Sequence, residues 1–333
     1  MFCKHTTVDD APLMAAAVVG ACRGEEWADP IQPRILGALF DRLLSYPCDF
    51  TTLTPATIDD VRGAGFSQAA RAEIVDLMVM AELLCNPIPV SMSASVDRWA
   101  VGLGVESDEL MVARDLARGA KIEAQADFYR NDYIGYADAE LPGFDRLFEQ
   151  YGPAAYVLTM EPDPAEEARH EALQECPPGS LGRSLWEFYK VRNFTFPGVL
   201  GGANLALAQH DWLHVLYGYD TDGIGEVEVA AFRMMSTDFP GASLGFLGTL
   251  LFYQSALLTS LVSGPHVGHE LEVAGAPERI ADALRRGRVC TLDPYDGIDF
   301  FDYAVVQVDE LRARWAILTP TADATIDTTI IPA

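Results

Sequence analysis

Apolar side chains recur every three or four positions along much of this chain, the spacing that places them on one face of an α-helix. Between Ser67 and Pro87 the repeat includes Ile74, Leu77 and Met78. Serine is a preferred N-cap and the residue before a proline disfavours helix, so both ends of this helix are marked. In the first 135 residues no alternation of apolar and polar positions competes with the helical pattern. We therefore predict an all-α fold.

Start and stop signals predict further helices in the same part of the chain. Thr54 followed by Pro55 is typical of a helix start, and Gly63 of a helix end. A longer helix is expected from about Asp108 to Tyr129. The methionine and aromatic residues spaced along these helices are expected to pack in the core. This part faintly resembles helical domains of the tellurite-resistance type, without their acidic metal motif.

A change of texture over residues 134–143 marks the expected join between two domains. Gly135 and Pro142 stand there among acidic residues, a composition typical of linkers. We predict a helical N-terminal domain over residues 1–138 and a second helical domain, a helical bundle, over residues 139–333.

Residues 241–262 contain no formal charge and are long enough to span a bilayer. Gln254 and several serines and threonines lower their hydrophobicity, and no basic flank is evident, so a helix buried in a large all-α domain is the preferred interpretation. Gly245 and Gly248 would leave room beside this helix, either for an isoprenoid tail or for contact with another helix.

Composition bounds the partners of the protein. Half of its 333 residues are apolar, which is enough for packed cores, and 49 acidic against 23 basic residues give a net charge of −26. Such a charge opposes binding to phosphates, so we expect no nucleic acid partner. One basic cluster could face an anionic headgroup or form a solvated helix face; it comprises Arg279, Arg285, Arg286 and Arg288.

The six cysteines form no close pair, which indicates neither a disulfide framework nor a thiolate zinc site. A reducing compartment fits best, so we expect a cytoplasmic protein, with a peripheral location at the inner face of the membrane as the alternative. A homodimer is a possible assembly, and the sequence does not determine the oligomeric state.

Metal-binding chemistry is indicated at one place in the sequence. His210, Asp211 and His214 fall within one turn of a predicted helix, where positions i and i+4 share a face. A glycine-rich loop follows, and it should return Glu226 at the start of a second, antiparallel helix. Two imidazoles and two carboxylates suit Zn, with Fe, Mn, Co or Mg as alternatives. The alternative reading is that both histidines are ordinary hydrogen-bonded residues.

Other polar residues allow weaker inferences. Ser180 is placed as an N-cap, and Arg183, a turn later, could bind a carboxylate or phosphate near the metal. Both are candidate cofactor-binding residues. His266, His269 and Glu270 resemble a metal cluster, but the neighbouring glycines and proline indicate a loop, so we interpret them as neighbours of the site or as unrelated to it.

Three ordered segments resemble the ubiquinone (coenzyme Q) biosynthesis protein 4 family. The first is the set His210, Asp211, His214 and Glu226, with the same eleven-residue gap before the glutamate. The others read PPGSLGRSLWEFY upstream and ALRRGRVCTLDPYD downstream. Together they cover about residues 140–333.

The resemblance implies an all-α protein that binds a divalent metal through the four residues and holds a long isoprenoid chain nearby. It implies removal of the ring carboxylate at C1 of a prenylated hydroxybenzoate, with hydroxylation there. Other quinone-biosynthesis proteins are implied as partners.

Three hypotheses follow for function. The first is a metal-dependent decarboxylase-type lyase acting on a prenylated quinone precursor, in which the same four residues form the catalytic centre. The second is a non-catalytic scaffold that binds isoprenoid lipid. The third is a metal hydrolase, in which a bound water of lowered pKa attacks an ester or phosphate.

Overall fold

The computed structural model describes residues 2–132, 134–136, 143–239 and 241–320, and within them the chain is built from helices. The prediction of an all-α fold is confirmed: these residues form no sheet, only isolated bridge pairs such as Leu158 with Ala203. The α-helices are α1 (Ala11–Cys22), α2 (Ile31–Leu44), α3 (Ile58–Gly63), α4 (Gln68–Leu83), α5 (Val90–Leu103), α6 (Asp108–Ala117), α7 (Lys121–Asn131), α9 (Phe144–Tyr151), α10 (Pro164–Glu171), α11 (Leu181–Arg192), α12 (Leu205–Tyr217), α13 (Gly223–Ser236), α14 (Ala242–Tyr253), α15 (Ala276–Val289) and α16 (Val308–Arg314).

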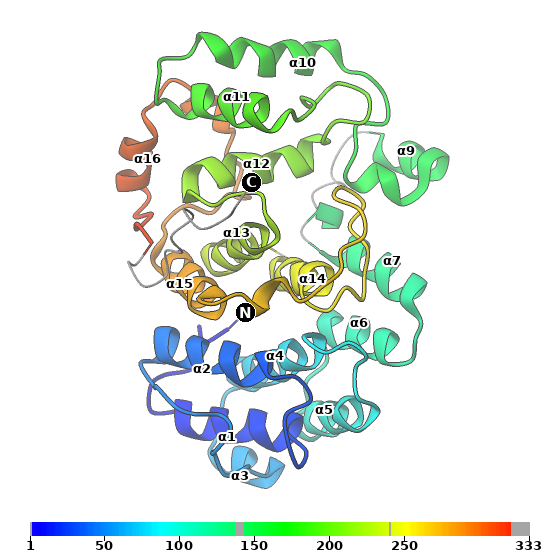
Figure 1. Cartoon of the computed structure of the whole chain (residues 1–333), viewed down its shortest axis with the longest axis vertical. Coiled ribbons are helices and arrows are strands. Elements are labelled where there is room, and N and C mark those ends of the chain that lie inside the picture. Colours follow the sequence, from blue (N-terminus) through cyan, green and yellow to red (C-terminus); the bar gives the residue numbers. More distant parts are fainter. Residues whose placement is uncertain (1, 133, 137–142, 240, 321–333) are drawn as a thin grey trace.

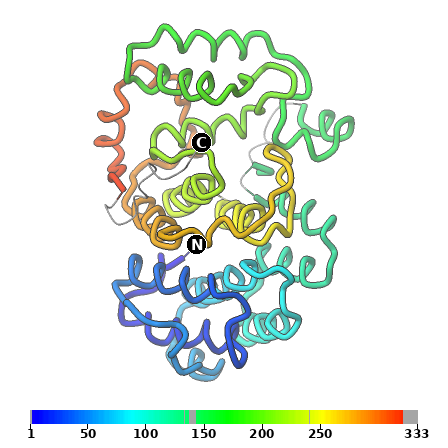
Figure 2. The backbone as a smooth tube through the Cα atoms, in the orientation of Figure 1, coloured from blue at the N-terminus to red at the C-terminus, as the bar shows by residue number. Residues whose placement is uncertain are grey.

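The helices form layers around α13. Helices α1 to α6 lie at one end of the molecule and α10 and α11 at the other, with α12 to α15 between them (Figure 1). Helix α13 packs against α14 and α15, and α15 in turn packs against α2. The tube in Figure 2 shows the same arrangement, with the N-terminus between the first helices and this central layer. The central layer is therefore covered on both sides, which suits a buried site.

The apolar core runs across the predicted domain boundary. Buried side chains from Phe2 to Ile317 belong to one cluster. Helix α14 packs against α4, α6 and α7, and the Asn86 amide donates to the Ser255 carbonyl at 2.7 Å. Residues 137–142 of the predicted linker lie outside the described residues, so the boundary itself stays a prediction.

The capping and glycine signals in the sequence predicted some helix ends correctly and others incorrectly. Ser67 caps α4 by accepting from Ala70 N, as expected. The predicted start at Thr54 was wrong: Thr57 caps α3 in a capping box with Asp60. The single helix expected from Asp108 is two, because Gly119, with φ of +77°, turns the chain between α6 and α7.

The uncharged segment 241–262 is helical only over α14, and its remaining residues form turns. In the described part of the chain no helix is long and apolar enough to cross a membrane. Gly248 makes a helix contact, since a Cβ there would lie 2.1 Å from a ring carbon of Phe128 on α7. Gly245 instead lines a cavity described below. The predicted helix contact is thus confirmed for Gly248, and room for an isoprenoid tail beside Gly245 stays a prediction.

A buried carboxyl in the first helices gives a testable pH dependence. Glu82 is 2% exposed, its Oε1 has no hydrogen-bond partner among the described residues, and burial raises its pKa from 4.5 to about 7. Because the folded state holds this proton more tightly than the unfolded state, the group favours folding below pH 4.5 and that contribution is lost as pH rises to 7. The difference amounts to about 3 kcal/mol.

Glu82→Gln is therefore expected to raise the free energy of unfolding by up to about 3 kcal/mol at pH 8 and to change it little at pH 4. Denaturant unfolding of both proteins at the two pH values measures this. An equal difference at both pH values would show that the charge of Glu82 does not set the effect.

Candidate metal centre

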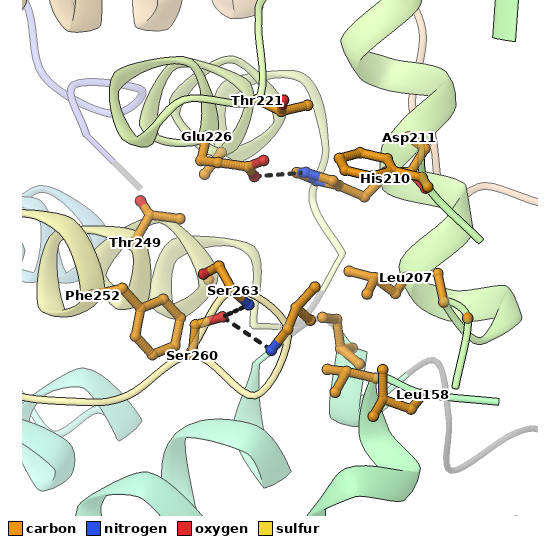
Figure 3. A pocket seen from close by; sticks show the side chains of 18 of the residues that line it. Leu158, Leu207, His210, Asp211, Thr221, Glu226, Thr249, Phe252, Ser260 and Ser263 are labelled. Atoms are coloured by element: carbon orange, nitrogen blue, oxygen red, sulfur yellow. Dashed lines mark hydrogen bonds and ion pairs between the residues drawn. The ribbon is translucent and has the colours of Figure 1, made fainter. Parts of the chain in front are cut away.

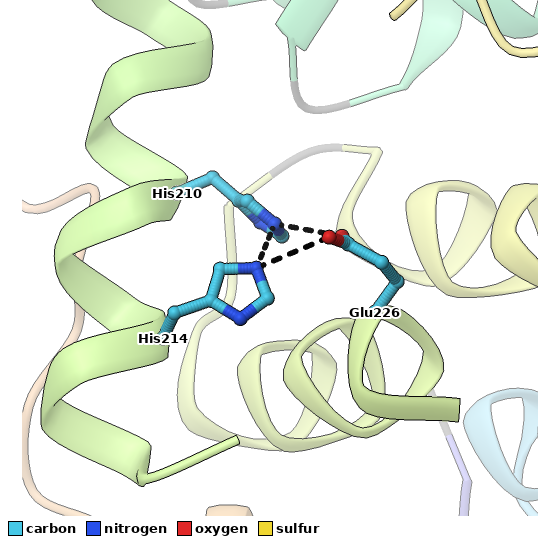
Figure 4. Close-up of side chains that lie close together, drawn as sticks. All are labelled: His210, His214 and Glu226. Carbon is cyan, nitrogen blue, oxygen red and sulfur yellow. Dashed lines mark hydrogen bonds and ion pairs between the residues drawn. The ribbon is translucent and has the colours of Figure 1, made fainter. Parts of the chain in front are cut away.

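Helix α12 carries the two histidines of the sequence motif. Its N-cap Asn204 accepts from Leu207 N at 2.9 Å, and it ends at Gly218, whose φ of +79° favours glycine. His210 and His214 are one turn apart, so their rings extend from the same face toward α13 (Figure 4). Both are buried.

Helix α13 supplies the carboxylate. Asp222 caps it by accepting from Gly225 N at 2.7 Å, which places Glu226 in the first turn. Gly225 is required at that turn, because a Cβ there would lie 2.1 Å from the carbonyl oxygen of Asp220. The helices were expected to be antiparallel, but they cross: Figure 4 shows α12 in the plane of the view and α13 nearly along its axis.

Three side chains converge where the helices cross. His210 Nε2 lies 3.0 Å from Glu226 Oε2 and 2.8 Å from His214 Nε2, and His214 Nε2 lies 3.4 Å from Glu226 Oε1. Atoms bound about 2.1 Å from one ion are about 3.0 Å apart at a right angle and about 3.4 Å apart at the tetrahedral angle. The two ring nitrogens and the two carboxylate oxygens therefore lie close to the separations that a single ion requires.

Hydrogen bonding outside the cluster orients one ring for binding. His214 Nδ1 lies 3.3 Å from the Tyr219 carbonyl, which can only accept, so Nδ1 carries the proton. The lone pair of Nε2 is then directed at His210 and Glu226. An imidazole that binds a metal through Nε2 has this tautomer. The loop between α12 and α13 thus fixes the orientation and the tautomer of the His214 ring.

The charge states also suit a cation. Burial lowers the pKa of His210 to about 4, and Arg233, whose Nη1 lies 3.4 Å from His210 Nδ1, acts in the same direction. Burial would raise the pKa of Glu226, but the two imidazoles hold it well below its ordinary value. Burial lowers the pKa of His214, and the charge of Glu226 outweighs this and raises it. Near neutral pH, a neutral His210 and an ionised Glu226 are ready to bind an ion.

Asp211 does not join the three. Its carboxylate accepts a hydrogen bond from the Tyr189 hydroxyl of α11, and burial raises its pKa to about 6. The groups close enough to hold one ion, among the described residues, are His210, His214 and Glu226. Three protein ligands leave at least one coordination position open, which is typical of catalytic rather than structural metal sites.

The predicted anion-binding residues lie elsewhere. Ser180 caps α11 by accepting from Arg183 N, as expected. The Arg183 guanidinium donates to Glu187 and to the Gln174 carbonyl, and Arg183 is not among the residues lining the cavity beside the metal centre. Its predicted contact with a ligand is therefore not supported by this arrangement.

Two arginines of the basic cluster of α15, Arg279 and Arg286, make structural contacts with other parts of the chain. Arg286 is 1% exposed and donates to the carbonyls of Tyr217 and Leu318 and to the Tyr219 hydroxyl. It thereby holds the loop that joins α12 to α13. Arg279 pairs with Glu228 on α13.

A cavity of about 590 Å³ opens beside the three ligands. His210, Asp211 and Glu226 lie at one end, and apolar side chains such as Leu158 and Phe252 lie further along it (Figure 3). The size is that of a small-molecule site. The metal-binding side chains lie at one end, and the rest of the lining combines apolar side chains with hydroxyl groups such as those of Ser260 and Ser263.

Sequence reasoning missed the charged residues that complete the polar end. Arg233 lies seven positions after Glu226 on the same face of α13, a spacing that could have indicated it. It is the one arginine or lysine among the described residues that line the cavity. Asp132, also buried there, has a pKa raised to about 7 by burial, partly offset by the charge of Arg233.

The fold and the site together define an all-α protein with a candidate two-histidine, one-glutamate metal centre at the end of an amphipathic cavity. No family model matches the chain, and no curated protein matches it. A solved structure that matches is that of a protein from Nostoc punctiforme PCC 73102 described as a putative ubiquinone biosynthesis protein. It is 18% identical, with 73% of this chain and 97% of that chain covered and a TM-score of 0.33. A likeness at this level does not establish the family.

Proposed function

We propose that this protein is a metal-dependent enzyme of ubiquinone or prenylquinone biosynthesis that acts on a prenylated hydroxybenzoate-type precursor. The observation that carries the proposal is that His210 and Glu226, which group with the buried His214, line one end of a cavity that also has an apolar part. A substrate with an anionic aromatic head and a hydrocarbon tail likewise has a charged part and an apolar part. The ordered sequence motif that surrounds these residues supports the same substrate class.

Charge supports an anionic headgroup. A divalent ion on the three ligands would add two positive charges to a site in which Glu226 contributes one negative charge and Arg233 one positive charge. Burial raises the pKa values of Asp132 and Asp211 to about 7 and about 6, so their negative charge at neutral pH is less than two and a net positive charge remains. A ring carboxylate could then lie between the ion and Arg233.

The apolar part of the cavity supports a hydrocarbon tail. Phe128, Ile134 and Phe252 line it, and Gly245 on α14 leaves room where a side chain would otherwise stand. Such a tail would come from a membrane, so we also propose a cytoplasmic protein that meets the membrane surface peripherally.

The reaction we propose replaces the bond from C1 to the carboxylate by a bond from C1 to oxygen, and it releases carbon dioxide. An oxidant such as dioxygen must take part, because the ring carbon is oxidised. A bound divalent ion would supply Lewis acidity toward the carboxylate and the developing charge. Asp211 and the Tyr189 hydroxyl, which share a hydrogen bond at the cavity wall, can hold a proton beside the substrate.

Zinc is the proposed ion and would act only as a Lewis acid, while iron(II), the main alternative, could also activate dioxygen. Two histidines and one carboxylate suit zinc in catalytic sites, and the same set forms the facial triad of iron(II) oxygenases. Manganese, cobalt and magnesium also accept these donors less specifically.

The test is turnover of a prenylated 4-hydroxybenzoate labelled with ¹³C in its carboxyl group, by metal-loaded protein in air. We expect labelled carbon dioxide and a product hydroxylated at C1, and we expect Glu226→Gln to form neither. Binding without turnover would replace this proposal by the lipid-binding scaffold. Hydrolysis of simple esters that stops on metal removal would replace it by the metal hydrolase.

A further inference from the structure

The loop after α14 forms part of the cavity wall and carries a second group of reactive side chains. Ser260, Val262 and Ser263 from this loop line the cavity (Figure 3). The residues that follow, His266 and Glu270, belong to neither the metal centre nor its hydrogen bonds.

Three of these side chains form a continuous hydrogen-bonded chain. Ser263 Oγ lies 2.8 Å from His266 Nε2, and His266 Nδ1 lies 3.0 Å from Glu270 Oε1. An ionised carboxylate can only accept, so Nδ1 carries the proton and Nε2 accepts from the serine hydroxyl. Hydroxyl, imidazole and carboxylate in this order are the arrangement of an activated serine nucleophile.

Packing against α13 and α14 holds the carboxylate and the ring. The Glu270 carboxylate lies against the start of α13, where a Cβ on Gly223 would come within 1.7 Å of Oε2. The His266 ring stands edge-on to Tyr253, with ring centroids 4.5 Å apart. The absence of a side chain at Gly223 therefore leaves room for the Glu270 carboxylate in this position.

Neighbouring residues in the same loop lack one member of the arrangement. His269 Nδ1 lies 2.7 Å from Glu272 Oε1. In the described part of the chain, no serine hydroxyl is hydrogen-bonded to the other ring nitrogen of His269. Ser260 Oγ accepts from the backbone N–H groups of Val262 and Ser263 instead of facing an imidazole. In this loop, only Ser263 is hydrogen-bonded to a histidine that also bonds a carboxylate. Ser263 is also exposed, so a ligand can reach it.

We propose that Ser263, His266 and Glu270 form a second catalytic site, which transfers the acyl group of an ester to Ser263 and then to water. The acyl group would be apolar, because the cavity beside Ser263 is lined by Phe128, Phe252 and Val262. This activity goes beyond the proposed quinone chemistry and does not depend on it.

The chemistry balances without a further reactant. As the bond from Ser263 Oγ to the ester carbonyl carbon forms, the hydroxyl proton passes to His266 Nε2, and the leaving alcohol takes that proton when its C–O bond breaks. Water then attacks the acyl-serine, gives a proton to His266, and the bond to Oγ breaks as the proton returns to it. Glu270 keeps the imidazole oriented and stabilises its positive charge throughout.

The experiment is covalent labelling with a fluorophosphonate probe, located by peptide mass spectrometry, on the whole protein with and without chelator. We expect one label, on Ser263, at a rate that chelator does not change. Ser263→Ala should abolish it, and His266→Asn should slow it by at least about 100-fold. The rates of p-nitrophenyl ester hydrolysis should rank the variants as the labelling rates do. The unmodified protein should hydrolyse the octanoate ester faster than the acetate ester.

His269→Asn is the matched control, because it removes a histidine with a carboxylate partner from the same loop and asparagine tolerates the positive φ of that position. It should label like the original chain. Absence of label on Ser263 would overturn the proposal. Equal labelling rates in His266→Asn and His269→Asn would also overturn it, provided that both variants keep the thermal unfolding midpoint of the unmodified protein. If His266→Asn unfolds, a Glu270→Gln variant decides, and an unchanged labelling rate there would overturn it.

Discussion

His214→Ala is expected to lower the metal content of the protein from about one ion per chain to near zero. His214 is buried, its Nε2 is directed at His210 and Glu226, and no neighbouring donor among the described residues replaces it. Loss of even an indirect partner of a metal ligand typically costs 10- to 100-fold in affinity, so loss of a ligand should cost more than about 100-fold. Elemental analysis after loading with excess metal and desalting measures this.

His170→Ala provides the matched control. His170 is as deeply buried as His214, but it bonds to the Glu166 carbonyl and packs on Phe301, away from the metal centre. Its replacement leaves a similar cavity and should leave the metal content unchanged. Equal metal contents in the two variants would show that His214 is not a ligand.

Arg286→Met should lower the free energy of unfolding by about 4 kcal/mol. Methionine keeps the length and much of the apolar volume of the side chain but removes the donors that bind Tyr217, Tyr219 and Leu318. The Tyr217 carbonyl and the Tyr219 hydroxyl, which lose a charged donor, are left buried, and each such loss costs between about 1 and 3 kcal/mol. Denaturant unfolding at neutral pH measures the change.

Arg314→Met is the control for loss of an arginine as such. Arg314 is about half exposed and pairs with Glu310 one turn earlier, an interaction worth only a few tenths of a kcal/mol. A loss below about 1 kcal/mol in Arg286→Met would mean that the loop between α12 and α13 does not depend on Arg286.

Local sequence signals were sufficient for the two helices of the metal centre. The spacing of His210 and His214 fixes a shared helical face, and the glycines after them fix the turn that returns Glu226. Asp211 shows where this reasoning ends. One helical turn allows its carboxylate to point toward the ion or toward α11, and Tyr189, which is remote in sequence, decides between the two.

Long-range packing also explains the other differences. The α15 arginines looked like a surface cluster, because a sequence pattern does not show that Arg286 lies over the loop of another helix pair. The cavity was equally hidden, since α7, α12, α13, α14 and the loop after α14 contribute to it from distant parts of the chain. Gly245 and Gly248 are three residues apart on one helix, yet one lines the cavity and the other contacts Phe128.

The central claim is that three residues, His210, His214 and Glu226, hold a metal ion while Asp211 is kept from it and a coordination position stays open. Asparagine at position 211 can still accept from the Tyr189 hydroxyl, so this change removes the charge without removing the hydrogen bond.

The most direct test is the metal content of Asp211→Asn and Glu226→Gln, loaded and desalted side by side. The three-ligand site predicts about one ion per chain in Asp211→Asn and almost none in Glu226→Gln. Loss of the ion from both variants alike would contradict it, because Asp211 would then be a fourth ligand.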